Sequence, residues 1–247
     1  MATAPPKDAG TAYSAEHAAI YDLIHAARGR NWAAEADDLA ALVRERNPGA
    51  RSLLDVACGT GAHLAALAPH FEETAGLELS SAMREIARRS APDTVIHPGD
   101  MRDFDLGRTY DAVLCMCFSL GYMTSQAELD AAAGALVRHL APGGVVVAEP
   151  WWFPEKFLDG FVSAALAEEP GRAVSRLSHS VRDGGLSRMT VRYTVADGDG
   201  IHEFTEYETY SLFPHDAYTT AFRRAGAAVE FLEGGPNGRG LFVGRRG

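Results

Sequence analysis

The feature that most constrains this fold is a buried strand followed directly by a glycine-containing loop and a helix. Residues 52–57 form a short apolar run, which is typical of a strand buried in a parallel sheet. A Cys-Gly-Thr-Gly loop follows at 58–61, and residues 62–69 have a helical pattern. Glycines let the backbone approach a ligand closely, and the start of the helix offers free N–H groups. The unit therefore predicts a ligand site at the end of a parallel strand.

Strands and helices alternate through the first part of the chain and again at its end. Strands are predicted over residues 52–57, 74–79, 94–97, 110–117, 145–149, 228–233 and 240–244, with helices over 14–28, 62–69, 80–89, 126–140 and 215–225 and from Asn31 onward. Parallel strands need crossover connections, so this alternation predicts an α/β fold. We expect a doubly wound, mostly parallel, seven-stranded Rossmann-like sheet with helices on both faces.

After Pro150 the pattern changes to extended segments with turn sequences between them. Three segments read as strands, over residues 173–182, 187–195 and 202–212. They predict a small antiparallel sheet inserted into the α/β fold. We expect a cofactor-binding domain and an insertion that contributes to substrate binding, with the domain formed by residues 1–150 and 213–247 and the insertion by residues 151–212.

Composition and charge narrow the class of protein. The 247 residues include 23 basic and 33 acidic side chains, and the net charge of −10 disfavours binding to nucleic-acid phosphates. No apolar run approaches the roughly 20 residues of a membrane helix, and residues 1–17 read as a flexible lead without a signal peptide. Cys58, Cys115 and Cys117 lack disulfide or metal-ligand spacing. We therefore expect reduced thiols, a cytoplasmic chain and no bound metal.

Acidic residues follow the predicted strands at one edge of the sheet. Asp55 lies in the first strand, and Glu78 ends the second, roughly 20 residues after the glycine loop, where an acid can accept hydrogen bonds from two ribose hydroxyls. Asp100 follows the third strand and can accept from an exocyclic amine, while Met101 can pack on a purine ring. These residue types favour a ligand with a ribose and a purine.

Together these motifs resemble the class I S-adenosylmethionine-dependent methyltransferases. The resemblance lies in the Asp-x-Ala-x-Gly-x-Gly loop at 55–61, in Glu78, in Gly-Asp-Met at 99–101 and in Leu-x-Pro-Gly-Gly at 140–144. A dinucleotide site would more often show Gly-x-Gly-x-x-Gly, which this loop lacks. The resemblance implies S-adenosylmethionine as the cofactor, bound by Asp55, Ala57, Gly59, Gly61, Glu78, Asp100, Met101 and Met116.

Three unusual segments narrow the resemblance further. Residues 149–155, 176–180 and 234–242 closely resemble bacterial N,N-dimethyltransferases that act on TDP-linked amino-deoxysugars of the desosamine, mycaminose and forosamine type. The similarity runs from about Tyr13 to Gly244. It implies two successive methylations of a sugar amine in macrolide-type biosynthesis. It also implies a homodimer, with the inserted sheet as the interface.

A TDP-sugar carries a diphosphate, and arginine pairs with phosphate oxygens in a bidentate way. Arg182 lies on an inserted strand and Arg239 in a glycine-rich loop. Aromatic side chains can stack on thymine or on a sugar face, and a carboxylate can stabilise the ammonium or bind a sugar hydroxyl. The expected substrate-binding residues are Glu149, Trp152, Phe153, Ser178, His179, Arg182 and Arg239.

Methyl transfer is an in-line displacement at carbon, so holding the amine in line can supply much of the rate. The expected catalytic residues are Tyr122, which follows the fourth strand, and Tyr13, which matches an active-site tyrosine of the resembled family. Tyrosine is a poor base at neutral pH, so we expect Tyr122 to orient the amine. Tyr21 and the segment around Arg28 and Arg30 match the part of the resembled enzymes that folds over the cofactor. A cation is expected there beside the methionine carboxylate, and we favour Arg28 over Arg30 for this role.

Two other interpretations fit parts of the pattern. Another small-molecule methyltransferase, acting on oxygen or nitrogen, would keep the cofactor acids without needing the diphosphate-binding residues. A non-catalytic cofactor-binding protein would not need an insertion with substrate-like residues. The sequence leaves open whether the amine is on C3 or C4, whether one or two methyl groups are added, and which natural product is made.

Overall fold

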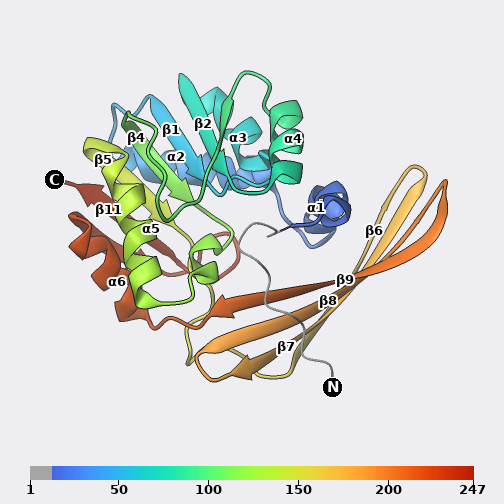
Figure 1. The fold of residues 1–247 in the computed structure, drawn as a ribbon. Coiled ribbons are helices and arrows are strands. Elements are labelled where there is room, and N and C mark those ends of the chain that lie inside the picture. Colours follow the sequence, from blue (N-terminus) through green and yellow to red (C-terminus); the bar gives the residue numbers. More distant parts are fainter. Residues whose placement is uncertain (1–12) are drawn as a thin grey trace.

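A computed structural model describes residues 13–247 and places seven strands in one sheet, sheet A (Figure 1). The strand order is β10-β11-β5-β4-β1-β2-β3, and β11 alone runs antiparallel to its neighbours. The predicted doubly wound, mostly parallel sheet is confirmed. Its strands are β1 (Ser52–Val56), β2 (Glu73–Glu78), β3 (Val95–Pro98), β4 (Tyr110–Cys115), β5 (Leu140–Ala148), β10 (Ala227–Leu232) and β11 (Leu241–Arg246).

Helices cover both faces of sheet A, and each face has its own apolar core. One core lies under α2 (Trp32–Arg46), α3 (Ala62–Leu67) and α4 (Ser81–Ser90), and the other under α5 (Gln126–Arg138) and α6 (His215–Arg224). Side-chain oxygens cap the N-termini of α2, α4 and α5. Two short 3-10 turns, η1 (Ala68–His70) and η2 (Ser119–Tyr122), complete this part of the chain.

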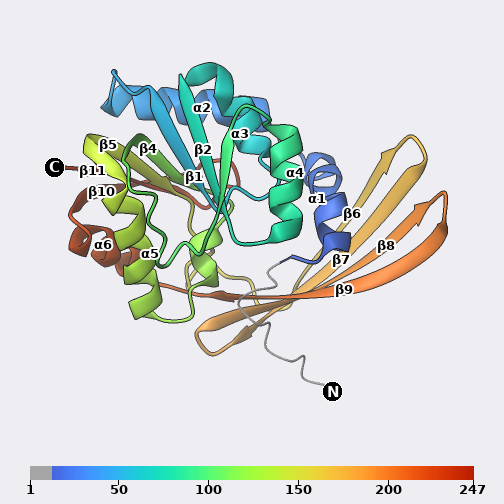
Figure 2. The ribbon, with the colours of Figure 1, turned by 45° about the horizontal axis from the view of Figure 1, so that its top comes forward.

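The inserted sheet, sheet B, has one strand more than predicted. Its order is β6 (Phe161–Glu169), β7 (Arg172–Asp183), β8 (Leu186–Asp197) and β9 (Gly200–Ser211), all antiparallel. The strand missed is β6, in which Ala167 alone is fully buried, so its apolar residues do not alternate with polar ones. In Figures 1 and 2, sheet B extends away from sheet A as a curved ribbon.

The first helix links the two sheets. In α1 (Ala15–Ala27), Ile20 and Ile24 pack against Val174 and Val191 on the inner face of sheet B. Figure 2 shows α1 between α4 and sheet B. Residues 1–12 of the predicted N-terminal lead lie outside the described residues. Within residues 13–247, none of the helices combines the length and the apolar character that a bilayer span requires.

The strand order reverses between β1 and β4, which are neighbours in sheet A. Open α/β sheets bind ligands in the crevice beyond the carboxyl ends of the strands at such a point. Asp55 lies in β1, and Met116 directly follows β4. The fold therefore brings the predicted cofactor residues to this crevice.

Candidate active site

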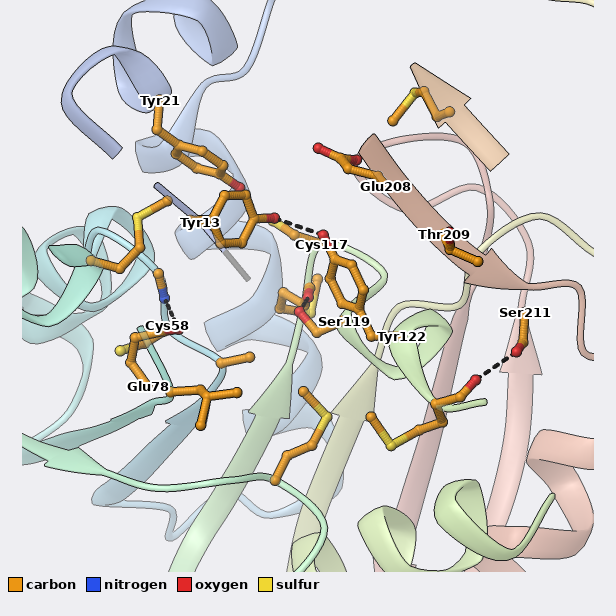
Figure 3. A pocket seen from close by; sticks show the side chains of 18 of the residues that line it. Tyr13, Tyr21, Cys58, Glu78, Cys117, Ser119, Tyr122, Glu208, Thr209 and Ser211 are labelled. Carbon is orange, nitrogen blue, oxygen red and sulfur yellow. Dashed lines mark hydrogen bonds between the residues drawn. The ribbon is translucent and has the colours of Figure 1, made fainter. Parts of the chain in front are cut away.

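A cavity of about 1200 Å³ lies between the carboxyl ends of the sheet A strands and the β8–β9 side of sheet B (Figure 3). Many of the predicted site residues line it: Tyr13, Tyr21, Asp55, Ala57, Gly59, Glu78, Asp100, Met101, Met116, Tyr122, His179 and Arg182. The others do not line it: Arg28, Gly61, Glu149, Trp152, Phe153, Ser178 and Arg239.

The glycine loop turns sharply because several residues have left-handed backbone angles. Ala57 and Gly59 have φ of 60° and 57°, and both line the cavity. Gly61, with φ of 76°, lies behind the loop, where a Cβ would approach the Cα of Ala87 to 3.0 Å. Gly61 therefore lets α3 pack closely on α4, while Gly59 presents its backbone to the ligand.

Glu78 is held by backbone groups at the end of β2. Its Oε2 accepts from the Gly59 N–H at 3.0 Å, and its Oε1 accepts from the Ser80 N–H at 2.7 Å. Burial raises the pKa of Glu78, and these N–H groups oppose that rise. A carboxylate has about four acceptor sites, so both oxygens can still accept from a ribose diol.

Asp55 is 2% exposed, and burial raises its pKa to about 7. It lies in β1 beside the glycine loop and lines the cavity. A buried carboxylate of this kind is stabilised when a ligand brings a positive charge or a hydrogen-bond donor to it.

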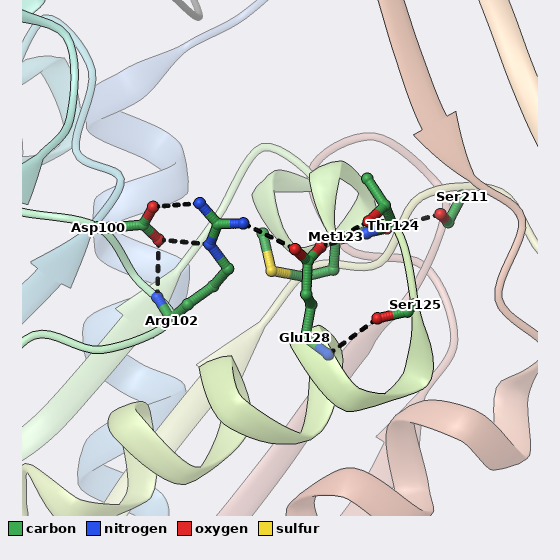
Figure 4. A network of polar contacts seen from close by, with 7 residues as sticks. All are labelled: Asp100, Arg102, Met123, Thr124, Ser125, Glu128 and Ser211. Atoms are coloured by element: carbon green, nitrogen blue, oxygen red, sulfur yellow. Dashed lines mark hydrogen bonds and ion pairs between the residues drawn. The ribbon is translucent and has the colours of Figure 1, made fainter. Parts of the chain in front are cut away.

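The side chain of Asp100 is fixed by Arg102 (Figure 4). The Arg102 guanidinium donates to both Asp100 oxygens, at 3.0 and 2.6 Å, and to Glu128 at 2.7 Å. These hydrogen bonds lower the pKa of Asp100. Glu128 also accepts from Thr124, and Ser211 donates to the carbonyl of Met123, which ties β9 to the same corner. Asp100 is thus an ionised acceptor at the cavity wall.

The two candidate arginines near α1 have different surroundings. Arg30 donates to Glu35 at 2.5 Å and to the cavity-lining Cys117 at 3.5 Å, and its Nε has no partner among the described residues. Arg28 lies near Arg176 of sheet B, and burial and that charge lower its pKa. Neither Arg28 nor Arg30 is among the residues that line the cavity, but Arg30 contacts Cys117, which is.

The hydroxyls of three tyrosines form a chain. The Tyr122 hydroxyl lies 2.9 Å from that of Tyr13 (Figure 3). It also lies 2.9 Å from the hydroxyl of Tyr210, which donates to Glu208. Burial raises the pKa of Tyr13 and Tyr122 well above the ordinary value. Both hydroxyls are therefore protonated at neutral pH. The sequence analysis brought Tyr13 and Tyr122 to one site, but it missed Tyr210 and Glu208.

Glu149 supports the turn after β4. Cys117 and Phe118 have consecutive positive φ angles of 53° and 54°, a strained backbone for residues other than glycine. Glu149 is completely buried and accepts from the Cys117 N–H at 2.9 Å and from Asn237 at 2.7 Å. We expected Glu149 to contact the substrate, but the structure places it behind this turn.

Arg239 lies among aromatic rings. Its guanidinium carbon is 4.6 Å from the Phe118 ring centroid and 4.7 Å from those of Trp151 and Trp152. The side chain is 12% exposed. Its Nη1 lies 4.0 Å from Glu149 Oε1, but Nε and Nη1 have no hydrogen-bond partner among the described residues. Buried guanidinium donors without a partner indicate a place for an anion. Trp152 therefore contacts Arg239 rather than the cavity.

Of the remaining substrate-binding candidates, two line the cavity and two are buried away from it. His179 and Arg182 line the cavity, and the Arg182 guanidinium donates to the carbonyl of Pro154. Ser178 is buried and accepts from Arg176 at 2.9 Å. Phe153 packs in the core against Phe242 and Tyr218, so its ring is not available for stacking on a base.

Comparisons with known proteins agree with this geometry. A family described as a methyltransferase domain matches residues 53–144. The chain is 58% identical over 239 residues to the dTDP-4-amino-2,3,4,6-tetradeoxy-D-glucose N,N-dimethyltransferase of Saccharopolyspora spinosa, across 97% of this chain and 96% of the relative. The chain belongs to this methyltransferase family.

Other relatives support the same assignment of the methyltransferase. This chain is 54% identical to the dTDP-3-amino-3,4,6-trideoxy-alpha-D-glucopyranose N,N-dimethyltransferase of Streptomyces venezuelae, across 94% of this chain and 98% of the relative. The crystal structure of Streptomyces venezuelae DesVI matches with a TM-score of 0.91 at 54% identity, across 95% of this chain and all of that one. A structure described as SAM-bound CalS10 matches with a TM-score of 0.86 at 46% identity, across 92% of this chain and 97% of that one.

The methyltransferase uses S-adenosylmethionine as methyl donor. The residues present fit this group. Glu78 has free acceptor sites for the ribose, and the left-handed backbone at Gly59 leaves open space where a side chain would stand. Leu77, Leu79 and Met101 supply apolar walls for adenine.

Proposed function

We propose that this methyltransferase dimethylates the amino group of a TDP-linked amino-deoxysugar in the biosynthesis of a macrolide-type natural product. The observation that carries the proposal is that one cavity joins the cofactor acids of sheet A to polar residues of sheet B. A volume of about 1200 Å³ exceeds the usual range for a single small ligand and accommodates two. The printed activities of relatives at 58% and 54% identity support the choice of acceptor.

We assign separate residues to the two ligands. Glu78 binds the ribose hydroxyls of the donor, Asp100 binds the adenine amine, and Arg30 binds the donor carboxylate. Arg182 and Arg239 bind the diphosphate of the sugar nucleotide, because Arg182 lines the cavity and two buried guanidinium nitrogens of Arg239 have no hydrogen-bond partner among the described residues.

When bound, S-adenosylmethionine supplies a methyl group activated by its sulfonium charge. The chain then needs mainly to hold the amine in line with that methyl group. The protonated hydroxyls of Tyr13 and Tyr122, fixed 2.9 Å apart, orient the amine by hydrogen bonding. Met116 and Cys117 wall the same region at the end of β4.

The test is incubation of the protein with S-adenosylmethionine and a panel of TDP-3-amino and TDP-4-amino sugars, with product masses read by mass spectrometry. We expect a gain of two methyl groups on at least one sugar. Methylation of hydroxyl-bearing acceptors, with none of the amino sugars, would instead identify another small-molecule methyltransferase. The matched control omits the sugar amine by using the corresponding TDP-deoxysugar with a hydroxyl group.

We also propose a homodimer formed through the outer face of sheet B. Val162, Leu166 and Leu177 lie on that face and are mostly exposed, a pattern typical of an interaction surface. Leu177→Glu should convert a dimer to a monomer in light scattering, whereas Leu158→Glu, an exposed leucine outside sheet B, should not.

We propose, in addition, a cytoplasmic location for the protein, which its three free thiols support.

A further inference from the structure

We propose that Glu208 binds the ammonium group of the sugar substrate and accepts its proton before methyl transfer. This inference rests on the proposed amino-sugar function. Glu208 lies on β9, lines the cavity and is 8% exposed. Figure 3 shows its carboxylate directed toward the tyrosines of the site.

The carboxylate of Glu208 is held at one oxygen and available at the other. Oε2 accepts from the Tyr210 hydroxyl, whereas Oε1 has no hydrogen-bond partner among residues 13–247. Within this same part of the chain, Glu208 forms no close ion pair, although the charge of Arg28 acts on it. Buried carboxylates are normally paired, so an unpaired one facing a cavity indicates a cationic ligand.

The charged and titratable groups around Glu208 come from several elements. Four tyrosines interact with it: Tyr13 and Tyr21 of the α1 segment, Tyr122 of η2 and Tyr193 of β8. The negative charge of Glu208 contributes to the raised pKa of each of these hydroxyls. Arg28 is a cation that interacts electrostatically with Glu208, and Arg176 of β7 repels Arg28. These groups leave the region between the tyrosines and Glu208 favourable for a positive charge.

The other carboxylates of the cavity have different places. Asp55 lies in β1 beside the glycine loop, on the donor side. Glu78 and Asp100 lie on the same side, where backbone N–H groups and Arg102 hold them. Glu128 pairs with Arg102, and Asp183 pairs with Arg188. Glu208, by contrast, is separated by two hydrogen bonds from the Tyr122 hydroxyl that orients the amine.

The proton transfer balances as follows. An N–H bond of the sugar ammonium breaks, its electron pair stays on nitrogen, and the proton passes to Glu208 Oε1, which becomes a neutral acid. The freed lone pair forms the new C–N bond while the bond from that methyl carbon to sulfur breaks and its electrons stay on sulfur. Glu208 then releases its proton to cavity water and takes the next one from the methylated ammonium, which prepares the second transfer.

The decisive variant is Glu208→Gln, which keeps the shape and an acceptor for Tyr210 but removes the charge. We expect kcat at pH 7 to fall by ~10²–10⁴-fold, the usual effect of losing a general base, and to recover as the pH rises above the pKa of the substrate amine. Glu206→Gln is the matched control, since Glu206 is a buried carboxylate on the same face of β9. Unchanged kcat in Glu208→Gln at pH 7 would overturn the proposal.

A binding measurement without the methyl donor provides a second readout. By calorimetry, the wild type should prefer a TDP-amino sugar over the same sugar with a hydroxyl group, and Glu208→Gln should lose this preference while binding the hydroxyl sugar as before. A preserved preference would show that the ammonium binds elsewhere. If the wild type methylates no amino sugar at all, it is the proposed function that fails.

Tyr210→Phe tests the same carboxylate in case Glu208→Gln does not fold. This variant keeps the charge but removes the hydroxyl that orients Glu208. We expect kcat at pH 7 to fall by about tenfold or more and to recover at high pH. Tyr193→Phe, which removes a buried hydroxyl bonded to His17, is the control. Equal rates in the two variants would contradict a role for Glu208.

Discussion

The Glu78 carboxylate accepts a hydrogen bond from the backbone N–H of Gly59 at 3.0 Å. This contact joins the end of β2 to the loop after β1, so the acid is in place before any ligand arrives. A preformed acceptor spares the ordering cost that a mobile side chain would add to binding.

Glu78→Ala should weaken binding of S-adenosylhomocysteine, measured by calorimetry. A charged acceptor lost from a buried site costs roughly 1–3 kcal/mol. Glu73→Ala, at the exposed start of the same strand, should bind like the wild type. Wild-type affinity in Glu78→Ala would mean that the ribose lies elsewhere.

Arg239→Ala should raise the KM for the nucleotide sugar far more than the KM for the methyl donor. The reason is that Nε and Nη1 of Arg239 have no hydrogen-bond partner within the described part of the chain, and Glu149 lies 4.0 Å from Nη1, so a diphosphate can bind them. Arg245→Ala, an exposed arginine on β11, serves as the control in steady-state kinetics. Equal effects on both KM values would show that Arg239 only supports the packing of Trp151 and Trp152.

Tyr122→Phe should retain substantial turnover. Burial raises the pKa of the Tyr122 hydroxyl and keeps it protonated, so we expect it to position the amine and not to take its proton. The pH dependence of the rate should be the same in the wild type and in the variant. A loss above ~10³-fold that high pH does not restore, with cofactor binding and folding intact, would instead identify Tyr122 as the required base or as an obligatory relay to Glu208.

Asp55→Asn should stabilise the ligand-free protein more at pH 8 than at pH 5. The pKa of Asp55 is about 7 in the folded chain, against 3.8 as the ordinary value, so the folded state binds the extra proton and stability falls as the pH rises through this window. At about 1.4 kcal/mol per pKa unit, the difference between the two pH values reaches about 3 kcal/mol. Urea unfolding measures it, with exposed Asp93→Asn as the reference. An equal effect at both pH values would contradict the raised pKa.

Local patterns were sufficient to predict most of the fold. The apolar run of β1, the glycine loop and the alternation that follows are short-range features, and the structure confirms the sheet they indicate. The start of β5 was different. Pro142 and Gly143 read as the end of a helix, yet the strand begins at Leu140, and its pairing with β4 shifts register between Tyr110 and Ala112. At this point the pairing of β5 with β4 outweighs the local preference of Pro142 and Gly143 for ending a helix.

The site was predictable only where each residue follows its own strand. Glu78 and Asp100 could be read from position alone. Glu208 could not, because its partners Tyr210, Tyr122 and Tyr13 come together only when β9 folds back beside η2. Phe153 and Trp152 are adjacent in sequence, yet one enters the core and the other contacts Arg239, a division that aromatic character cannot reveal.

Sheet B is formed by a single continuous segment of the chain between β5 and α6, whereas the residues that we assign to the methyl donor lie mainly at the ends of sheet A strands and in the loops that follow them. Such a division lets evolution alter the two halves at different speeds. Two relatives whose names place the amine at different sugar carbons are 58% and 54% identical to this chain. Under the proposed function, a change confined to sheet B would alter the sugar that is bound without altering the loops that hold the donor.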